Sequence, residues 1–433
     1  MATPRSSAYT AASGAGIYAG IASPPFTIPA PGGTANISRN NYTAININPA
    51  TWATSYPNTS PWRNWCGAAF ASGFSANGAM IYWGGGHNGG SGTDAYVFDF
   101  TTAEWSRVGP GDPTTDYMRE RDSESNPGLS LLDTTWADYP HAGGNIIPAT
   151  HTYAYPCYIP PEFAGAGPKG QWLLTNVVLG PFWNAAGVRI DGGMKPHYID
   201  LSTGFEDRWT TNIGTQAGQP GFAGTIVDTV RGKVFWGAAE AATINVVNLA
   251  DSHPRAIATQ AMSGNRFAEA QAYYPIYVYV PAADRFVELS CAYGTTVPMI
   301  AVYNTTTGNC VHAGFITLPT TGRPTLNPGF GADWVPSRSA FYIYDGAGST
   351  TVHKLHCSDP ANLGAATWTW SAETFSGPAW PSGYVDASGN SRPHSKWRYI
   401  PAIDCFAWCD VGFAAVCQDG LTHDNAMQLW RPN

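Results

Sequence analysis

A short apolar segment recurs six times along the chain, and each copy is followed closely by a second segment rich in Val, Ile and Tyr. The copies begin at residues 79, 171, 233, 285, 340 and 405. Four of the five steps between them are 52 to 65 residues, and the step from 79 to 171 is 92. Segments this short suit strands rather than helices. A recurring period of about 50 residues indicates a repeat architecture in which each repeat is one supersecondary unit.

The composition supports strands over helices. Gly occurs 48 times and Pro 34 times, charged residues make up 12% of the chain and aromatic residues 13%. Runs of the strong helix formers Ala, Leu, Glu, Lys and Arg are missing. Turns built from Gly, Pro, Asn and Thr, between short β-branched and aromatic stretches, are typical of antiparallel sheets. We therefore expect an all-β fold.

The first repeat carries the most specific pattern. Residues 79–86 read AMIYWGGG, and residues 95–105 read AYVFDFTTAEW after a glycine-rich loop. An apolar strand ends in glycines that permit a sharp turn, a tyrosine-bearing strand follows, and a polar turn leads to a tryptophan. This pattern resembles a kelch repeat, and the order and spacing of the weaker copies extend the resemblance to residues 40–433. It implies a kelch-like β-propeller of the galactose-oxidase central-domain-like superfamily, in which the tryptophan packs between blades.

The repeats divide the chain into two parts. Residues 1–38 read as an extended low-complexity arm and residues 39–433 as a six-bladed propeller, with an insertion at 109–147. Seven blades are the alternative if that insertion holds a degenerate repeat. The last repeat lacks an outer strand, and a propeller must close its ring. The alternating stretch from Tyr42 to Asn48 is our prediction for the closing N-terminal strand.

Charge and apolar patterning exclude several classes of partner. The formal net charge is −8, without a basic cluster, which argues against nucleic acid. No apolar stretch is long enough to insert in a membrane, and the first 38 residues lack the features of a secretory signal.

Eight cysteines allow either disulfides or free thiols. We favour free, buried thiols that act as small hydrophobic side chains. Cys405 and Cys409 lie four residues apart on a predicted strand, about 13 Å, which is too far for one metal ion. The eight are Cys66, Cys157, Cys291, Cys310, Cys357, Cys405, Cys409 and Cys417.

We find no sequence signature of a propeller enzyme. The repeated Ser-x-Asp-x-Gly-x-x-Trp box of sialidases, a nucleophile elbow, a His-Glu-x-x-His helix and a phosphate loop are all missing from the sequence. The copper ligands of galactose-oxidase-like enzymes cannot be mapped onto this chain. We therefore predict no catalytic residue, no metal and no cofactor.

Candidate ligand-binding residues fall into three groups. A polar ring around the axis would come from residues at the starts of first strands, with a water-filled channel as the alternative. Loop residues after the triple glycine either face a ligand or satisfy loop backbone groups. The insertion offers arginines and aromatic side chains, either for specificity or as a solvated surface. The ring comprises His151, Glu269, Asp333 and His394; the loop, His87 and Asn88; the insertion, Arg119, Arg121, Trp136 and Tyr139.

The combination favours a non-enzymatic binding or structural protein. Low charge and many Trp and Tyr residues, without an export signal, are typical of phage virion proteins, which fold in the host cytoplasm. We expect a tail fibre, receptor-binding or decoration protein that binds a surface glycan or another virion protein, with homo-oligomerisation through the arm. The alternatives are a carbohydrate-active or copper-dependent oxidase-like enzyme and a bacterial kelch-like interaction protein, located outside the cell or at its surface.

Overall fold

The computed structural model describes most of the six repeats. The described residues are 23–45, 67–83, 95–108, 140–141, 144–145, 155–163, 165–175, 182–183, 189–190, 197–204, 206–208, 224–237, 243–251, 255–262, 273–291, 295–346, 349–376, 393–409 and 414–433. The statements below refer to these residues.

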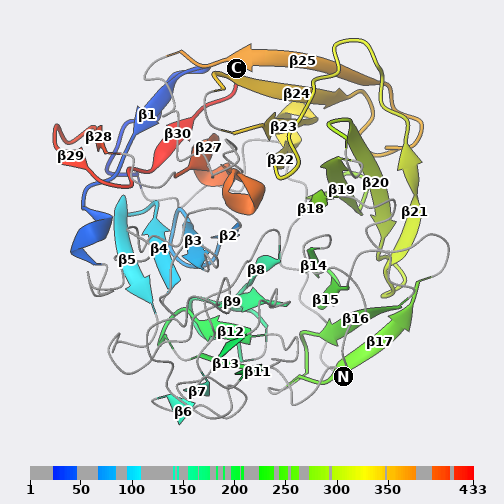
Figure 1. The fold of residues 1–433 in the computed structure, drawn as a ribbon, viewed down its shortest axis with the longest axis horizontal. Coiled ribbons are helices and arrows are strands. Elements are labelled where there is room, and N and C mark those ends of the chain that lie inside the picture. The colour runs from blue at the N-terminus through cyan, green and yellow to red at the C-terminus, as the bar shows by residue number, and fades with distance from the viewer. Residues whose placement is uncertain are drawn as a thin grey trace.

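The chain forms six four-stranded antiparallel sheets, which we number as blades in chain order (Figure 1). Inner strands of neighbouring blades contact one another all the way around, so the ring is closed. From the axis outward, blade 1 contains β2 (Gly67–Ala71), β3 (Ala79–Trp83), β4 (Ala95–Asp99) and β5 (Glu104–Val108). Blade 2 contains β8 (Pro156–Ile159), β9 (Gln171–Leu174), β12 (His197–Asp200) and β13 (Glu206–Arg208). Blade 3 contains β14 (Thr225–Asp228), β15 (Lys233–Trp236), β16 (Thr243–Asn248) and β17 (Ile257–Ala261).

The remaining blades follow the same order. Blade 4 contains β18 (Tyr273–Val280), β19 (Arg285–Cys291), β20 (Pro298–Asn304) and β21 (Val311–Ile316). Blade 5 contains β22 (Gly331–Val335), β23 (Ala340–Tyr344), β24 (Thr351–Cys357) and β25 (Trp368–Thr374). Blade 6 contains β26 (Arg398–Ile400), β27 (Cys405–Trp408), β30 (Gln428–Trp430) and, as its outer strand, β1 (Thr34–Asn36).

These strands confirm the all-β, six-bladed prediction. The six predicted second strands are β3, β9, β15, β19, β23 and β27, each one position out from the axis. Within the described part of the 109–147 insertion there is one two-stranded sheet, β6 (Pro140–His141) with β7 (Gly144–Asn145), which is not a seventh blade. No described helix is long and apolar enough to cross a membrane.

An N-terminal strand closes the ring, as predicted, but not the strand that we chose. β1 pairs antiparallel with β30, so that Ala35 lies opposite Leu429. The stretch predicted to close the ring starts with a 3₁₀ turn, η1 (Tyr42–Ala44), and its residues 46–48 lie outside the described part. Tyr42 turns inward because its ring packs edge-on against Tyr96 of blade 1, at 4.8 Å between centroids. Residues 34–36, which we had placed in the arm, therefore belong to blade 6.

Polar side chains reinforce this closure. Gln428 Nε2 donates to Asn36 Oδ1 at 3.0 Å, and the Met427 amide donates to Ser38 Oγ at 2.8 Å. Asn36 and Ser38 are buried, so these bonds satisfy polar groups that would otherwise be costly inside the protein. The segment also reaches blade 5, because the Thr34 amide donates to the Ser376 carbonyl at 3.0 Å.

Aromatic side chains fill the space between blades. Trp105, Trp172, Trp236, Trp397, Trp408 and Trp430 are among the largest fully buried side chains. Trp105, the tryptophan of the first repeat, donates from Nε1 to the Asn425 carbonyl at 3.1 Å and so links blade 1 to blade 6. This is the packing between blades that the resemblance implied for it.

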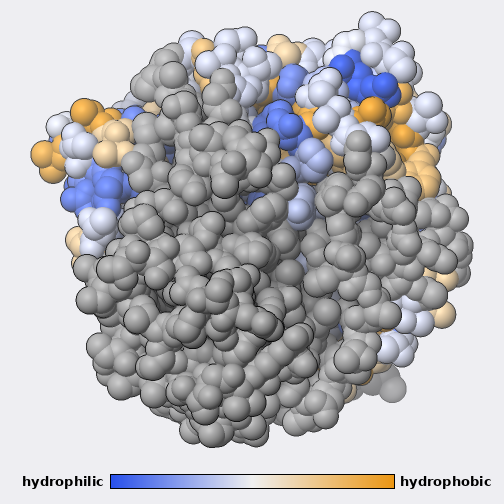
Figure 2. Space-filling model, in the orientation of Figure 1, coloured by the Kyte–Doolittle hydropathy of each residue, from blue (hydrophilic) through white to orange (hydrophobic). Residues whose placement is uncertain are grey.

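A small hairpin projects from the edge of blade 6. It consists of β28 (Ala415–Val416) and β29 (Thr422–His423), and Val416 and Leu421 are 65% and 60% exposed. In Figure 2 the corresponding region at the left edge shows apolar colour beside hydrophilic residues.

The cysteine prediction is confirmed for the seven described cysteines, all of which are free. Six of them are buried and Cys157 is half-buried. Burial raises the pKa of the Cys291 and Cys405 thiols to about 12 and that of Cys417 to about 11. These thiols are therefore protonated and unreactive near neutral pH.

We predict that a Cys66→Ser variant, which retains the seven described cysteines, will scarcely react with Ellman's reagent at pH 8 while folded. The same sample in denaturant should titrate all seven thiols. Rapid stoichiometric reaction of a native thiol would contradict the burial.

The closing strand gives a second prediction. A chain that begins at Ser23 keeps every closing contact described above and is the reference for the comparison. A chain that begins at Arg39, without the whole predicted arm, loses β1 and the buried Ile37, so its Tm should fall by about 10 °C or more. Differential scanning calorimetry of both truncations makes the comparison, and equal melting of the two would show that β1 is dispensable.

Candidate functional site

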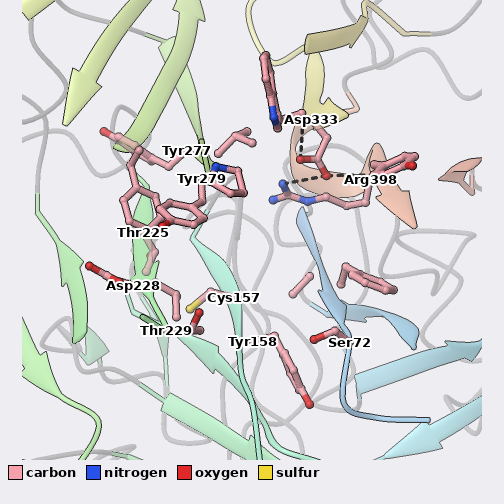
Figure 3. A pocket seen from close by; sticks show the side chains of 18 of the residues that line it. Ser72, Cys157, Tyr158, Thr225, Asp228, Thr229, Tyr277, Tyr279, Asp333 and Arg398 are labelled. Atoms are coloured by element: carbon pink, nitrogen blue, oxygen red, sulfur yellow. Dashed lines mark hydrogen bonds and ion pairs between the residues drawn. The ribbon is translucent and has the colours of Figure 1, made fainter. Parts of the chain in front are cut away.

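A cavity of about 300 Å³ lies where the inner strands of all six blades meet (Figure 3). Its wall comes from β2, β8, β14, β18, β22 and β26 and from the turns that follow them. This size is at the lower end of pockets that take small molecules. Of the lining residues, Val230 is 56% exposed and Ser72 and Pro336 are also exposed, so the cavity opens to solvent at this face.

A repeated tripeptide builds much of the wall. In four blades the inner strand ends with an aromatic residue, a fully buried Ile or Val, and a proline. Proline lacks the amide proton that would continue the sheet, so the strand ends and the chain turns away from the axis. Both the aromatic residue and the proline of each copy line the cavity. The copies are Tyr158–Pro160, Tyr279–Pro281, Trp334–Pro336 and Tyr399–Pro401.

Two charged side chains from neighbouring blades face each other across the wall. Asp333 of β22 and Arg398 of β26 lie 3.9 Å apart, from Oδ2 to Nη1, and are 18% and 17% exposed. Backbone amides fix the carboxylate, because Trp334 N donates to Oδ1 at 2.9 Å and Tyr399 N to Oδ2 at 3.1 Å. Arg398 Nε donates to the Ser395 carbonyl at 3.0 Å. Figure 3 shows this pair beside the space that the other labelled side chains surround.

Burial acts on both charges. It raises the pKa of Asp333, although the nearby Arg398 charge and the two backbone amides oppose the shift. It lowers the pKa of Arg398, and the charge of Asp333 opposes that shift. A guanidinium stays protonated near neutral pH in spite of such a shift. The cavity therefore contains a charge pair whose desolvation is only partly compensated by the protein.

Hydrogen bonds from hydroxyl groups fix two further side chains of the cavity wall, Tyr277 and Thr225. Tyr277 and Tyr303 both donate to Glu288 Oε2, at 3.1 and 2.8 Å. Burial, followed by the charge of Glu288, raises the pKa of Tyr277 well above its usual value. Thr225 Oγ1 donates to the Tyr155 carbonyl at 3.1 Å and forms a hydrogen bond with the hydroxyl of Thr175. These bonds set the positions of the Tyr277 and Thr225 side chains that line the cavity.

Cys157 also lines the cavity but is not arranged as a nucleophile. Its Sγ contacts the Leu173 carbonyl at 3.6 Å, and burial raises the pKa of its thiol far above the usual value. The charge of Arg398 lowers this pKa but does not outweigh burial. The thiolate is the reactive form of cysteine, so Cys157 lines the cavity as a neutral, unreactive side chain.

Arginine clamps join blades at the rim of the cavity. Between blades 5 and 6, Arg338 Nη1 and Nη2 donate to the two carboxylate oxygens of Asp404 at 2.7 and 3.1 Å, and Tyr399 Oη donates to Oδ1 at 2.8 Å. Asp404 has a φ of 51°, in the left-handed region that Asp tolerates better than bulky residues. The clamp fixes Tyr399 next to Arg398.

Blades 3 and 4 carry the same arrangement. Arg231 pairs with Asp284, and Tyr279 Oη donates to Asp284 Oδ1 at 2.8 Å. Asp284 has a φ of 52°, matching the turn of the other clamp. Arg231 also donates to Asp228 at 3.1 Å, so Asp228 at the cavity shares the charge of Arg231 with Asp284.

The structure describes two of the ten predicted site residues. Asp333 lines the cavity, as expected for a polar residue at the axis. His394 begins the 3₁₀ turn η5 (His394–Lys396), is fully buried, and packs at 5.1 Å against the ring of Tyr274, but it is not part of the cavity lining. Asp333 and His394 therefore do not lie together at the cavity as members of the predicted polar ring. The other eight lie outside the described residues: His87, Asn88, Arg119, Arg121, Trp136, Tyr139, His151 and Glu269.

Arg398, Tyr277 and the aromatic side chains of the tripeptide were not among the residues predicted from the sequence. A detectable signal was present, because the aromatic–aliphatic–proline ending recurs at the same point of four repeats. Arg398 is also a charged residue in an otherwise apolar inner strand. Among the described residues, no group of three or more His, Cys, Asp or Glu side chains is arranged to hold a metal ion.

No family model matches this chain, and no curated protein is similar to it in sequence. Solved structures with a similar fold include a Lactobacillus plantarum protein, at 12% identity and a TM-score of 0.40, over 81% of this chain and 96% of that one. A putative oxidoreductase (glucose dehydrogenase) of Thermus thermophilus is similar at 10% identity and a TM-score of 0.40, over 86% and 96%. A putative 6-phosphogluconolactonase of Bacteroides uniformis is similar at 11% identity and 0.35, over 84% and 81%. Values this low say nothing about activity, and the six-bladed architecture is established by the strand pairing of this chain.

The clamp at Asp404 predicts a pH-dependent contribution to stability. Burial alone would raise the pKa of Asp404, but hydrogen bonds from Arg338 and Tyr399 outweigh it and hold the pKa below its usual value. The ionised carboxylate therefore stabilises the fold above about pH 4, and this contribution is lost as the pH falls further. Asp404→Asn should lower the free energy of unfolding at pH 7 by about 1 to 3 kcal/mol, with a smaller difference near pH 3.

Urea unfolding at both pH values measures this difference. Glu104→Gln is the matched control, because Glu104 is exposed on β5 and no described residue hydrogen-bonds its side chain. The clamp would be refuted if Asp404→Asn changed stability as little as Glu104→Gln.

Proposed function

We propose that the chain is a non-enzymatic binding propeller that takes a small polyhydroxylated ligand, a single sugar or the terminal sugar of a glycan, in the cavity at its axis. The observation that supports this best is the Asp333–Arg398 pair, set among aromatic side chains at the open end of the ring.

The cavity offers the three kinds of contact that a sugar uses. Carboxylate oxygens accept hydrogen bonds from hydroxyl groups, and guanidinium N–H groups donate to hydroxyl or ring oxygens. Tyr158, Tyr279, Trp334 and Tyr399 provide large, rigid side chains on which the apolar C–H surface of a sugar can pack. Few polar groups within a mainly apolar, concave wall are typical of small-molecule sites.

The fixed carboxylates favour binding over hydrolysis. Glycoside hydrolysis requires one carboxyl group as acid and a second as base or nucleophile. The raised pKa of Asp333 would suit the acid, but Asp228, the other carboxylate of the lining, accepts from the Arg231 amide at 3.0 Å and from Arg231 Nη1 at 3.1 Å. Both oxygens of Asp228 are therefore already engaged as acceptors within the protein.

The biological setting that we propose comes from composition and from the repeat pattern. We propose that the repeats are degenerate kelch motifs, on the strength of residues 79–105, and that the protein serves attachment as part of a phage virion. A cavity that takes one terminal sugar suits attachment to a surface glycan.

Ligand-observed NMR with a panel of neutral and acidic monosaccharides tests the binding function. We expect at least one sugar to bind the wild-type chain, and Thr229→Trp, which places a large side chain at the cavity, to weaken that binding at least about tenfold. Val297→Trp is the matched control, because Val297 is 39% exposed and does not line the cavity. Release of reducing ends or copper-dependent peroxide production would favour an enzyme instead.

A further inference from the structure

The guanidinium of Arg398 has N–H donors that no described residue accepts. A guanidinium carries five N–H donors, and Nε accounts for one of them by donating to the Ser395 carbonyl. Nη1 lies 3.9 Å from Asp333 Oδ2, which is beyond hydrogen-bonding distance. Within the described residues, the four N–H groups of Nη1 and Nη2 have no hydrogen-bond acceptor. They belong to a side chain that lines the cavity.

Two backbone amides hold Asp333 in a position where it does not hydrogen-bond with those donors. Each of its carboxylate oxygens already accepts a backbone amide, one from Trp334 and one from Tyr399. Arg398 and Asp333 therefore do not form the paired arrangement seen at Arg338 and Asp404, which has two parallel N–H···O bonds.

Arg398 is the one cationic side chain in the cavity lining described here. Asp228 is hydrogen-bonded to Arg231, which it shares with Asp284, and burial raises the pKa of Tyr158, Tyr277 and Tyr279, so these hydroxyls stay uncharged. A planar fork of such N–H groups fits a carboxylate, with which it can form two parallel hydrogen bonds.

We propose that the ligand is an acidic sugar whose carboxylate is bound by Nη1 and Nη2 of Arg398. This inference rests on the proposed sugar-binding function and specifies which sugars the cavity selects. Asp333, held by its two backbone amides, then accepts a hydrogen bond from a ligand hydroxyl group and repels the ligand carboxylate.

Isothermal titration calorimetry with D-glucuronate and D-glucose tests the proposal, because the two sugars differ in a carboxylate against a hydroxymethyl group. The full-length chain should bind glucuronate about tenfold or more tightly than glucose, as expected for charge-assisted hydrogen bonds. Arg398→Met should reduce this preference to about one. Arg398→Lys, which keeps the charge without the fork, should give an intermediate preference.

Asp333→Asn separates this role from a purely structural one. Removing the carboxylate charge next to Arg398 should leave the preference for glucuronate intact or increase it. If Asp333→Asn instead abolished the preference as Arg398→Met does, the pair would act as a structural unit and the proposal would be overturned. Melting temperatures of the variants verify that each is folded, and Arg398→Lys decides the question if Arg398→Met does not fold.

The outcomes distinguish the two levels of the proposal. Equal binding of glucuronate and glucose by the wild-type chain would overturn the carboxylate assignment and leave sugar binding intact. Binding of neither sugar, nor of any other in the NMR panel, would overturn the proposed function as well.

Discussion

The pairing of β1 with β30 is the interaction on which the rest of the structure depends. Arg398 lies on the inner strand of blade 6, and the outer strand of that blade comes from the other end of the chain. Since the cavity is bounded by all six inner strands, an open ring would leave its wall incomplete. Closure of the ring therefore joins the two ends of the chain and completes the wall of the cavity. The contacts from Thr34 to Ser376 extend this closure to blade 5, which carries Asp333.

A second constraint is the cost of charge at the axis. Isolated buried charges are expensive, and breaking a buried pair costs about 3 to 5 kcal/mol. Asp333 is compensated by two backbone amides, whereas Arg398 keeps donors at the cavity that no described residue accepts. Arg231 and Arg338 instead each pair with a carboxylate of the next blade. Arginine thus joins neighbouring blades in the two clamps, whereas Arg398 provides donors for a ligand in the cavity.

Much of the fold was predictable because each strand is specified locally. The six apolar segments, the first at Ala79 and the last at Cys405, are rich in residues that favour strands and are bounded by turn residues. Their position second from the axis followed from the order of the repeats. The closing strand was misassigned because Thr34–Asn36 and Tyr42–Asn48 both suit an edge strand by pattern. Packing of Tyr42 onto Tyr96 decided between them, and no local rule reports that contact.

By itself, the sequence determined the all-β class and favoured six blades over seven and free thiols over disulfides. These follow from composition, period and local propensity, which act within a few residues. Only the tertiary structure decided that Asp333 meets Arg398, 65 residues further along the chain, without a direct hydrogen bond between them. It also decided that His394 packs against Tyr274 instead of lining the cavity. Such pairings depend on how inner strands of different blades face one another around the axis, a geometry set only when the ring is closed.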